Sequence, residues 1–248
     1  MNSSVERAAQ AVRARLHLGT EEPLVNLLDA VEVGLGIPVV VASLGEQGLA
    51  GAYKQSRGEP FILVNGTNAL VRCRFTLAHE LGHHELGHRS SVDVGIDLAS
   101  TDPAERDANA FAAELLLPLD ALHQWLRAER SISLETVARL ANDFQVSAQV
   151  ARFRLAAAGR LSRRLINDLD RAIEAQEHHG MAARHGWRRR VDGLNAARRR
   201  QVRLPDEAER VFVTAWRKSL LDDEQLAARL HITVDEVSAM TAQLDPEP

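Results

Sequence analysis

His79-Glu80-Leu81-Gly82-His83 is the stretch of this 248-residue chain that decides its fold. A helix has about 3.6 residues per turn, so His79 and His83 share one face and both imidazoles can reach one metal ion. Glu80 lies beside them, close enough for its carboxylate to take a proton from water. The pentapeptide therefore predicts a helix that carries two metal ligands and a general base.

The same pentapeptide recurs at once as His84-Glu85-Leu86-Gly87-His88. A shift of five positions rotates a helix by roughly 140°, so the second pair of histidines cannot share the face of the first. The first copy follows the apolar run Phe75-Thr76-Leu77-Ala78, which suits a helix buried behind a cleft. A metal site needs dry and firm support, so we expect the first copy to hold the metal. The role of the second copy stays open.

A third metal ligand is expected downstream, because catalytic zinc keeps three protein ligands and one open position. The segment 101–114 predicts a second helix. On it Glu105 and Asn109 are one turn apart and share a face with Ala108 and Ala112, whose small side chains permit close approach to the first helix. This face suits a carboxylate ligand supported by an amide.

Glu105 also has a second interpretation. With Asp102 as the N-cap and Pro103 at the first helical position, Glu105 is the third residue of the helix, where a glutamate commonly completes a capping box. Asp107 and Glu114 are the other acidic candidates on the same helix. The residues favour Glu105 as the ligand and leave these alternatives open.

Three motifs in order resemble the ImmA/IrrE metallopeptidases. They are Asn65 after the apolar run 61–64, the stretch 74–83 with His88 beyond it, and the stretch 105–118. The resemblance covers roughly residues 20 to 160. It implies a cytoplasmic zinc endopeptidase that cuts a helix-turn-helix transcriptional repressor and so relieves repression of mobile-element or stress genes.

The resemblance also implies roles for particular residues. It assigns one zinc ion to His79, His83 and Glu105, and it makes Glu80 the catalytic glutamate. Asn109 is a candidate for supporting the ligands, and Tyr53, the only tyrosine, is a candidate for stabilising the oxyanion. Two arginines are rivals of Tyr53 for that role, namely Arg72 and Arg74.

The pattern of apolar residues predicts an α+β fold, in which a mostly helical, zincin-like metallopeptidase domain with a small β-sheet precedes helix-turn-helix-like helical regions. The expected helices cover 5–16, 24–35 and about 69–88, the expected strands 38–42, 49–53 and 60–64. We divide the chain into the metallopeptidase domain at 1–130, a helix-turn-helix-like region at 131–161, an arginine-rich linker or joint at 162–204, and a C-terminal helical module at 205–248.

Two segments are candidates for DNA contact. The segment 145–154 offers Gln145, Gln149, Arg152 and Arg154 on what would be a recognition helix. The segment 184–203 holds eight arginines and one aspartate, although a solvated linker or helix face explains such a stretch equally simply. The last helix pair presents the acidic residues Asp235 and Glu236, which favours packing or partner binding over DNA contact.

Composition is consistent with an enzyme of the cytoplasm. The net charge of -4 gives no general sign of nucleic-acid binding, and Cys73 is the single cysteine, so no internal disulfide can form. We identify no signal peptide and no apolar run long enough to cross a membrane. Two hypotheses remain: a zinc endopeptidase, and a DNA-binding regulator with a structural zinc site. Glu80 favours the first, because a structural site has no use for a general base.

Overall fold

The computed structural model describes residues 3–45, 49–56, 59–89, 91–93, 97–98, 100–187, 193–198 and 202–241. Within these residues, five strands form one mixed sheet in the order β4-β2-β3-β1-β5. The strands are β1 (Val39–Ala42), β2 (Gly51–Ser56), β3 (Glu59–Asn65), β4 (Ser91–Asp93) and β5 (Val202–Arg203). Strand β1 runs parallel to β3, and the other neighbouring strands are antiparallel.

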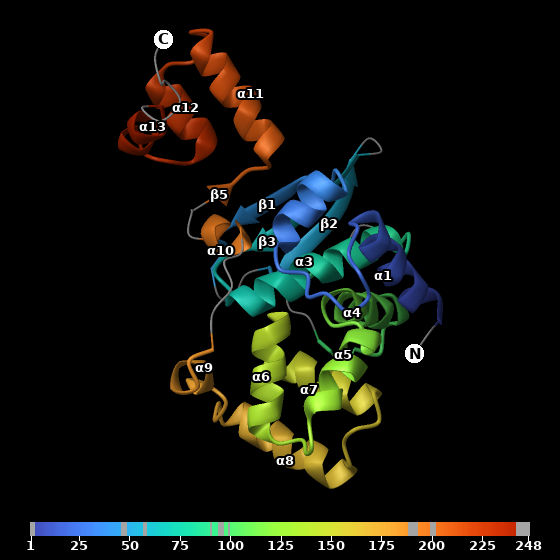
Figure 1. The fold of residues 1–248 in the computed structure, drawn as a ribbon. Coiled ribbons are helices and arrows are strands. Elements are labelled where there is room, and N and C mark those ends of the chain that lie inside the picture. Colours follow the sequence, from blue (N-terminus) through green and yellow to red (C-terminus); the bar gives the residue numbers. More distant parts are fainter. Residues whose placement is uncertain are drawn as a thin grey trace.

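Helices make up most of the remaining chain, which confirms the predicted α+β class (Figure 1). The N-terminal part contains α1 (Ser3–Arg15), α2 (Leu27–Asp29) with a π-helical turn (Ala30–Gly34), α3 (Leu70–Glu85) and α4 (Pro103–Leu116). The middle part contains α5 (Leu119–Trp125) with a 3-10 turn (Leu126–Ala128), α6 (Leu134–Phe144), α7 (Ala148–Ala157), α8 (Arg163–Glu174) and α9 (Met181–Arg184). The chain continues with α10 (Gly193–Ala197), α11 (Asp206–Arg217), α12 (Asp223–Leu230) and α13 (Val234–Thr241).

Several element boundaries differ from the predicted ones. The hairpin strands are longer than expected and reach Ser56 and Glu59, because residues 54–56 and 59–61 also pair with each other. The expected helix at 24–35 is a short α-helix that continues as a π-helical turn. The expected helix to His88 was too long: α3 ends at Glu85, since Gly87 takes a left-handed φ of 69° and His88 N donates to His83 O.

Helix α3 is buried between the sheet and α4. Every residue from Cys73 to His83 is buried, because β2 and β3 contact one side of the helix and α4 packs along another (Figure 1). The close approach of α4 depends on Gly82. A Cβ atom on Gly82 would lie 3.0 Å from Phe111 Cδ1 and 3.3 Å from Ala108 Cα, so a larger residue would force the helices apart.

One apolar core joins the first two predicted ranges. Side chains of α6 and α7, such as Val137 and Leu155, belong to the same buried cluster as those of α1 and α3. Helix α6 ends at Phe144, where the C-cap Gln145 adopts a left-handed φ of 54°, and Ser147 caps the start of α7. The range 131–161 therefore packs as part of the body that contains the sheet.

The chain returns to this body after α9. Strand β5 pairs with β1, and the guanidinium group of the buried Arg203 binds Glu32 Oε1 at 2.6 Å and Val39 O at 3.1 Å. Arg198 Nε donates to Gly66 O at 3.3 Å. The predicted joint at 162–204 thus contributes a strand to the sheet. The arginine clusters 188–190 and 199–200 lie outside the described residues.

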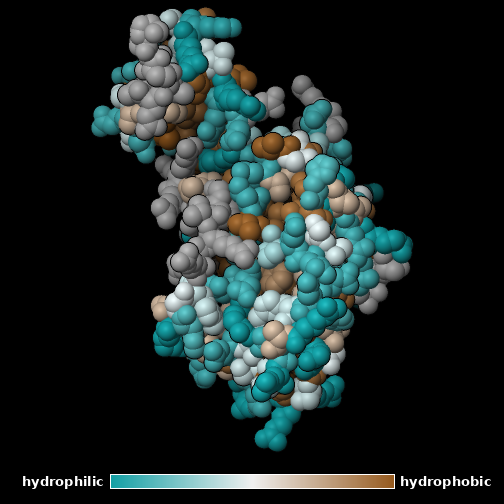
Figure 2. Space-filling model, viewed as in Figure 1, coloured by the Kyte–Doolittle hydropathy of each residue, from teal (hydrophilic) through white to brown (hydrophobic). Residues whose placement is uncertain are grey.

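The last three helices, α11 to α13, have an apolar cluster of their own. It is built on Leu226, Ala227, Leu230 and Val237, and Phe212 and Trp216 of α11 pack against it. Figure 1 shows this module at one end of the molecule, beyond β5. On the face shown in Figure 2, hydrophilic residues dominate and hydrophobic residues form small patches. No helix in the described part of the chain has the length and apolar character needed to cross a membrane.

Candidate metal centre

Three side chains from two helices converge where α3 crosses α4. His79 and His83 come from successive turns of α3, and Glu105 comes from the first turn of α4. His79 Nε2 lies 3.1 Å from His83 Nε2 and 3.2 Å from Glu105 Oε2, and His83 Nε2 lies 3.4 Å from Glu105 Oε1. Two ligand atoms of a tetrahedral zinc ion are separated by about 3.3 Å. The donor set therefore fits zinc in both its chemistry and its spacing.

The far nitrogen of each imidazole has a partner. His79 Nδ1 lies 3.0 Å from Asn109 Oδ1, and Asn109 Nδ2 in turn donates to Asp97 O at 2.9 Å. His83 Nδ1 lies 3.1 Å from His88 Nδ1. When both ligand histidines carry their proton on Nδ1, both Nε2 lone pairs point toward each other and toward a carboxylate. A cation stabilises such a cluster of electron-pair donors. In metal sites, partners of the far ring nitrogens commonly orient the ligating histidines in this way.

Glu105 does not complete a capping box. Asp102 Oδ1 accepts the backbone N–H groups of Ala104 and Glu105 at 2.8 and 3.2 Å, as expected of the N-cap. The N–H of Asp102 donates to Ser100 Oγ at 3.3 Å, while the Glu105 carboxylate lies against the two histidines. The first turn of α4 is thus capped without the Glu105 side chain, which is directed to the candidate metal centre.

The two alternative acidic residues lie elsewhere. Glu114 forms a buried ion pair with Arg154, and Asp107 lines a pocket of about 450 Å³ between α4 and α7. Among the described residues, the only group of His, Cys, Asp and Glu side chains spaced to hold a metal ion is His79, His83 and Glu105, whose ligand atoms all lie within 4.8 Å of one another.

Glu80 lies on the side of α3 that faces the sheet. Its side chain is fully buried and borders Gly51 of β2. Because Glu80 directly follows His79 on the helix, its carboxylate is next to the candidate ligands yet outside their set. A buried carboxylate at that position has the location that a general base for water requires.

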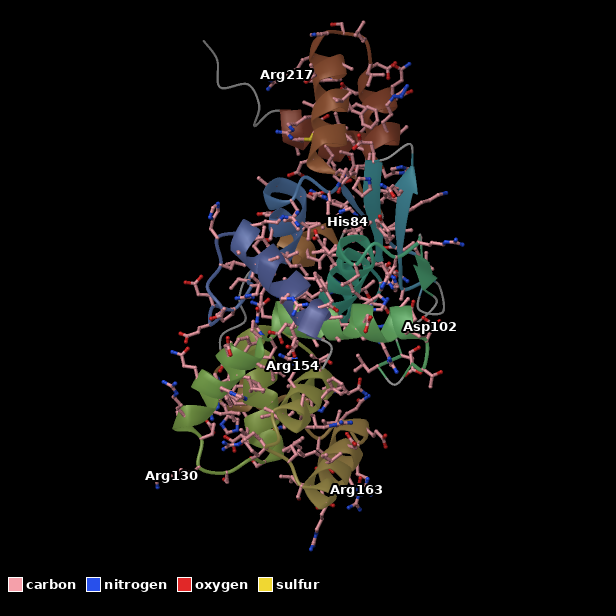
Figure 3. All side chains as sticks on the ribbon, turned by 90° about the vertical axis from the view of Figure 1, so that its right-hand side faces the viewer. His84, Asp102, Arg130, Arg154, Arg163 and Arg217 are labelled. Atoms are coloured by element: carbon pink, nitrogen blue, oxygen red, sulfur yellow. The ribbon has the colours of Figure 1, made fainter. Side chains whose placement is uncertain are left out.

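Tyr53 contacts the second pentapeptide. Its hydroxyl lies 3.1 Å from His84 Nδ1, and the two rings meet edge to face with centroids 5.5 Å apart. Figure 3 labels His84 where α3 meets the strands. The rival Arg74 is buried and donates to the carbonyl oxygens of Leu24, Val25 and Gln145, so its guanidinium group is occupied far from this contact. The sequence did not predict the contacts of His84 and His88, since the first depends on how β2 packs against α3 and the second on where α3 ends.

The expectation of DNA contact through 145–154 finds no support in the structure. Helix α7 is a core element: Arg154 is buried against Glu114, and Arg152 pairs with Asp170 of α8. The side-chain amide of Gln145 is buried, whereas Gln149 is exposed. A recognition helix needs several polar side chains free to reach base edges, and α7 has committed most of them to internal contacts.

Comparison with known proteins agrees with this geometry. Residues 34–156 match a peptidase family model described as the IrrE N-terminal-like domain. The chain is also 34% identical over 83 residues to the uncharacterized immunity region protein 2 of Bacillus phage phi105. That alignment covers 33% of this chain and 52% of the phage protein, so the chain spans about half the length of this curated relative. The matched family region contains all three candidate ligands and runs from Gly34, the end of the π-helical turn, into α7.

Proposed function

We propose that this chain, which belongs through residues 34–156 to the ImmA/IrrE family of peptidases, is a zinc-dependent endopeptidase that cuts a helix-turn-helix transcriptional repressor. The observation that carries the proposal is the convergence of His79, His83 and Glu105 beside the buried Glu80. Two imidazoles and one carboxylate leave the fourth position of a tetrahedral ion open for substrate, as a catalytic site requires.

The chemistry assigned to the chain's own residues is a proton relay. Zinc, when bound, would supply Lewis acidity that polarises the scissile carbonyl and lowers the pKa of water toward neutrality. Glu80 accepts a proton from the attacking water as the water oxygen bonds to the carbonyl carbon and the π electron pair moves onto the carbonyl oxygen. Glu80 then gives the proton to the amide nitrogen, and the C–N bond breaks to release the amine.

The substrate class rests on two supports. Members of the resembled family cut repressors, and the phage relative is named as an immunity region protein. Within the described residues, β4 pairs with Gly51 to Tyr53 of β2 and is an outer strand of the sheet, so an extended peptide segment can add to this edge. We place the reaction in the cytoplasm, where a DNA-bound repressor is found, and we expect cleavage to relieve repression of mobile-element or stress genes.

The test compares wild type with Glu80→Gln. Each protein is purified, its zinc content is measured, and it is incubated with a helix-turn-helix repressor encoded beside it in its genome. We expect both proteins to bind about one zinc ion and only wild type to cut. Glu85→Gln is the matched control, because Glu85 holds the same place in the second pentapeptide but pairs with Arg15 at 2.8 Å near the surface. It should cut normally.

Other outcomes are equally informative. Glu105→Ala should lose zinc, whereas Asp107→Ala should keep it. If wild type binds zinc, cuts no repressor and shifts DNA, the alternative of a DNA-binding regulator with a structural zinc site replaces the protease.

A further inference from the structure

The second pentapeptide places His84 on the face of α3 that carries Glu80, the proposed general base. Glu80 and His84 are four positions apart and therefore lie on one face, a single turn from each other. This face is turned toward β2, because Glu80 borders Gly51 and His84 contacts Tyr53. The face that carries His79 and His83 is turned toward α4.

Strand β2 runs along this face, and two residues of the strand span about the same length as one turn of the helix. Gly51 and Tyr53 point to the same side of the strand, since side chains alternate along a strand. The strand therefore contacts the helix first at Glu80 and, two residues later, at His84. The hydroxyl of Tyr53 lies one helical turn beyond the carboxylate proposed to activate water, at the end of β2 that pairs with β4.

We propose that the Tyr53 hydroxyl stabilises the oxyanion formed from the scissile carbonyl, and that His84 is the positioning residue that holds this hydroxyl in place. The inference deepens the proposed peptidase function and rests on it. Hydrolysis moves an electron pair onto the carbonyl oxygen, and that charge needs a hydrogen-bond donor which is already in position. Tyr53 donates a hydrogen bond in this step and transfers no proton.

The hydrogen bond between the two side chains can leave the tyrosine proton available. When His84 carries its proton on Nδ1, Nδ1–H donates to Tyr53 Oη, and the hydroxyl hydrogen points elsewhere. Burial raises the pKa of Tyr53, so the phenol stays a neutral donor at the pH values where peptidases act. The second pentapeptide then serves the reaction through His84, while His88 supports the ligand His83.

The competing explanation is that Tyr53 only packs in the sheet, since a buried tyrosine hydroxyl usually finds some partner. Four variants separate the two. Tyr53→Phe removes only the hydroxyl, His84→Leu removes its partner, and His84→Asn keeps an amide where Nδ1 was. The fourth variant combines Tyr53→Phe with His84→Leu. Lys54→Ala, an exposed change on the same strand, is the control.

The expected result is a fall in kcat without a change in zinc content or thermal unfolding. Loss of one oxyanion donor lowers kcat by about 100-fold to 1,000-fold, and KM should stay within about twofold. His84→Leu should show a similar loss, and His84→Asn should recover at least about tenfold of it. The double variant should be no slower than Tyr53→Phe, because His84 acts through Tyr53.

A second readout does not depend on turnover. A peptidyl phosphonate carries oxygens that mimic the oxyanion, whereas a peptidyl thiol of the same sequence does not. Both are made with the residues that flank the cleavage site of the repressor. Tyr53→Phe should weaken phosphonate binding by about tenfold or more and leave thiol binding unchanged, since a good hydrogen bond to a charged group is worth at least that factor.

Each of the other outcomes overturns the inference, and together they distinguish its failure from failure of the proposed peptidase function. If wild type cuts the repressor and Tyr53→Phe cuts equally well, the inference fails while the protease stands. If Tyr53→Phe loses zinc or stability together with activity, the tyrosine is structural. If the losses of the two single variants multiply in the double variant, His84 does not act through Tyr53. If wild type cuts nothing and binds the phosphonate no better than the thiol, both proposals fail.

Discussion

A Cβ atom added to Gly51 would lie 2.8 Å from Glu80 Oε1 and 2.3 Å from Thr76 Cγ2, so this glycine of β2 is in direct contact with the proposed general base. The backbone of β2 can approach α3 this closely only because position 51 has no side chain. The distance between strand and helix in turn sets where Tyr53 meets His84. One glycine therefore influences the positions of both Glu80, the proposed general base, and Tyr53, the proposed hydrogen-bond donor.

Gly51→Ala should consequently damage stability and activity together. The methyl group must displace either the strand or the helix, and overpacking of this kind costs about 1 to 3 kcal/mol of unfolding free energy. Urea denaturation of the metal-free protein and the rate of repressor cleavage measure the two effects. Gly19→Ala is the control, since its nearest neighbouring side-chain atoms would lie at 3.8 Å and no shift is needed. Equal stability of the two variants would show that α3 and β2 can accommodate the added methyl group without loss of stability.

Asn109→Ala should weaken metal binding. The amide oxygen of Asn109 accepts from His79 Nδ1 in the arrangement that orients the ring, and loss of such a partner commonly costs about 10-fold to 100-fold in metal affinity. Competition with a chelator of known zinc affinity gives the change. Asn167→Ala, an exposed change on α8, should leave the affinity as it is. An unchanged affinity for Asn109→Ala would mean that packing alone holds His79.

Substitutions of His84 and His88, the two histidines of the second pentapeptide, should have different effects on zinc affinity. His88→Leu removes the partner of His83 Nδ1 and should lower zinc affinity by about 10-fold to 100-fold. His84→Leu should leave zinc affinity unchanged, because its partner is Tyr53. The same chelator competition compares them. A loss of zinc in the His84 variant with none in the His88 variant would reverse the assignment.

Arg154→Met should destabilise the fold strongly. Arg154 and Glu114 are both buried and form an ion pair between α7 and α4, so removal of the cation leaves a buried carboxylate without its counter-charge. Breaking a buried pair in this way costs about 3 to 5 kcal/mol. Changing Glu114→Leu as well should recover much of the loss, which urea denaturation of the single and double variants can measure. No recovery would indicate that the carboxylate is not the source of the penalty.

Shortened proteins test where the peptidase body ends. A chain that stops at residue 204 keeps β5, Arg203 and the buried Leu194, and should fold and bind zinc like the full chain. A chain that stops at residue 192 loses them and exposes the edge of β1. We expect it to unfold at least several degrees lower, because each kcal/mol shifts the midpoint by about 2 to 4 °C in a protein of this size. Equal midpoints would place the end of the body before α10.

The sequence alone determined the class of fold and the central helix. Periodicity placed helices and strands close to their observed bounds, and the arithmetic of a helical turn put His79 and His83 on one face. The N-cap at Asp102 also follows directly from the chain. These features are local: each depends on residues within a few positions of one another, so the order of residues is enough to predict them. The division into four ranges remains a prediction that the shortened proteins would examine.

Only the tertiary structure decided which distant groups meet. Glu105, Asp107 and Glu114 were all acidic candidates on one helix, and the packing of α4 on α3 brings only Glu105 to the histidines. The left-handed Gly87 ends α3 early and turns His88 back toward His83, whereas an unbroken helix would have carried it away. Arg154 looked free to reach DNA and is buried against Glu114. The contacts of Glu105 and Arg154 join residues that are far apart in the chain. When several residues of the same chemical type are available, a local sequence pattern does not indicate which of them will reach a given partner in the fold.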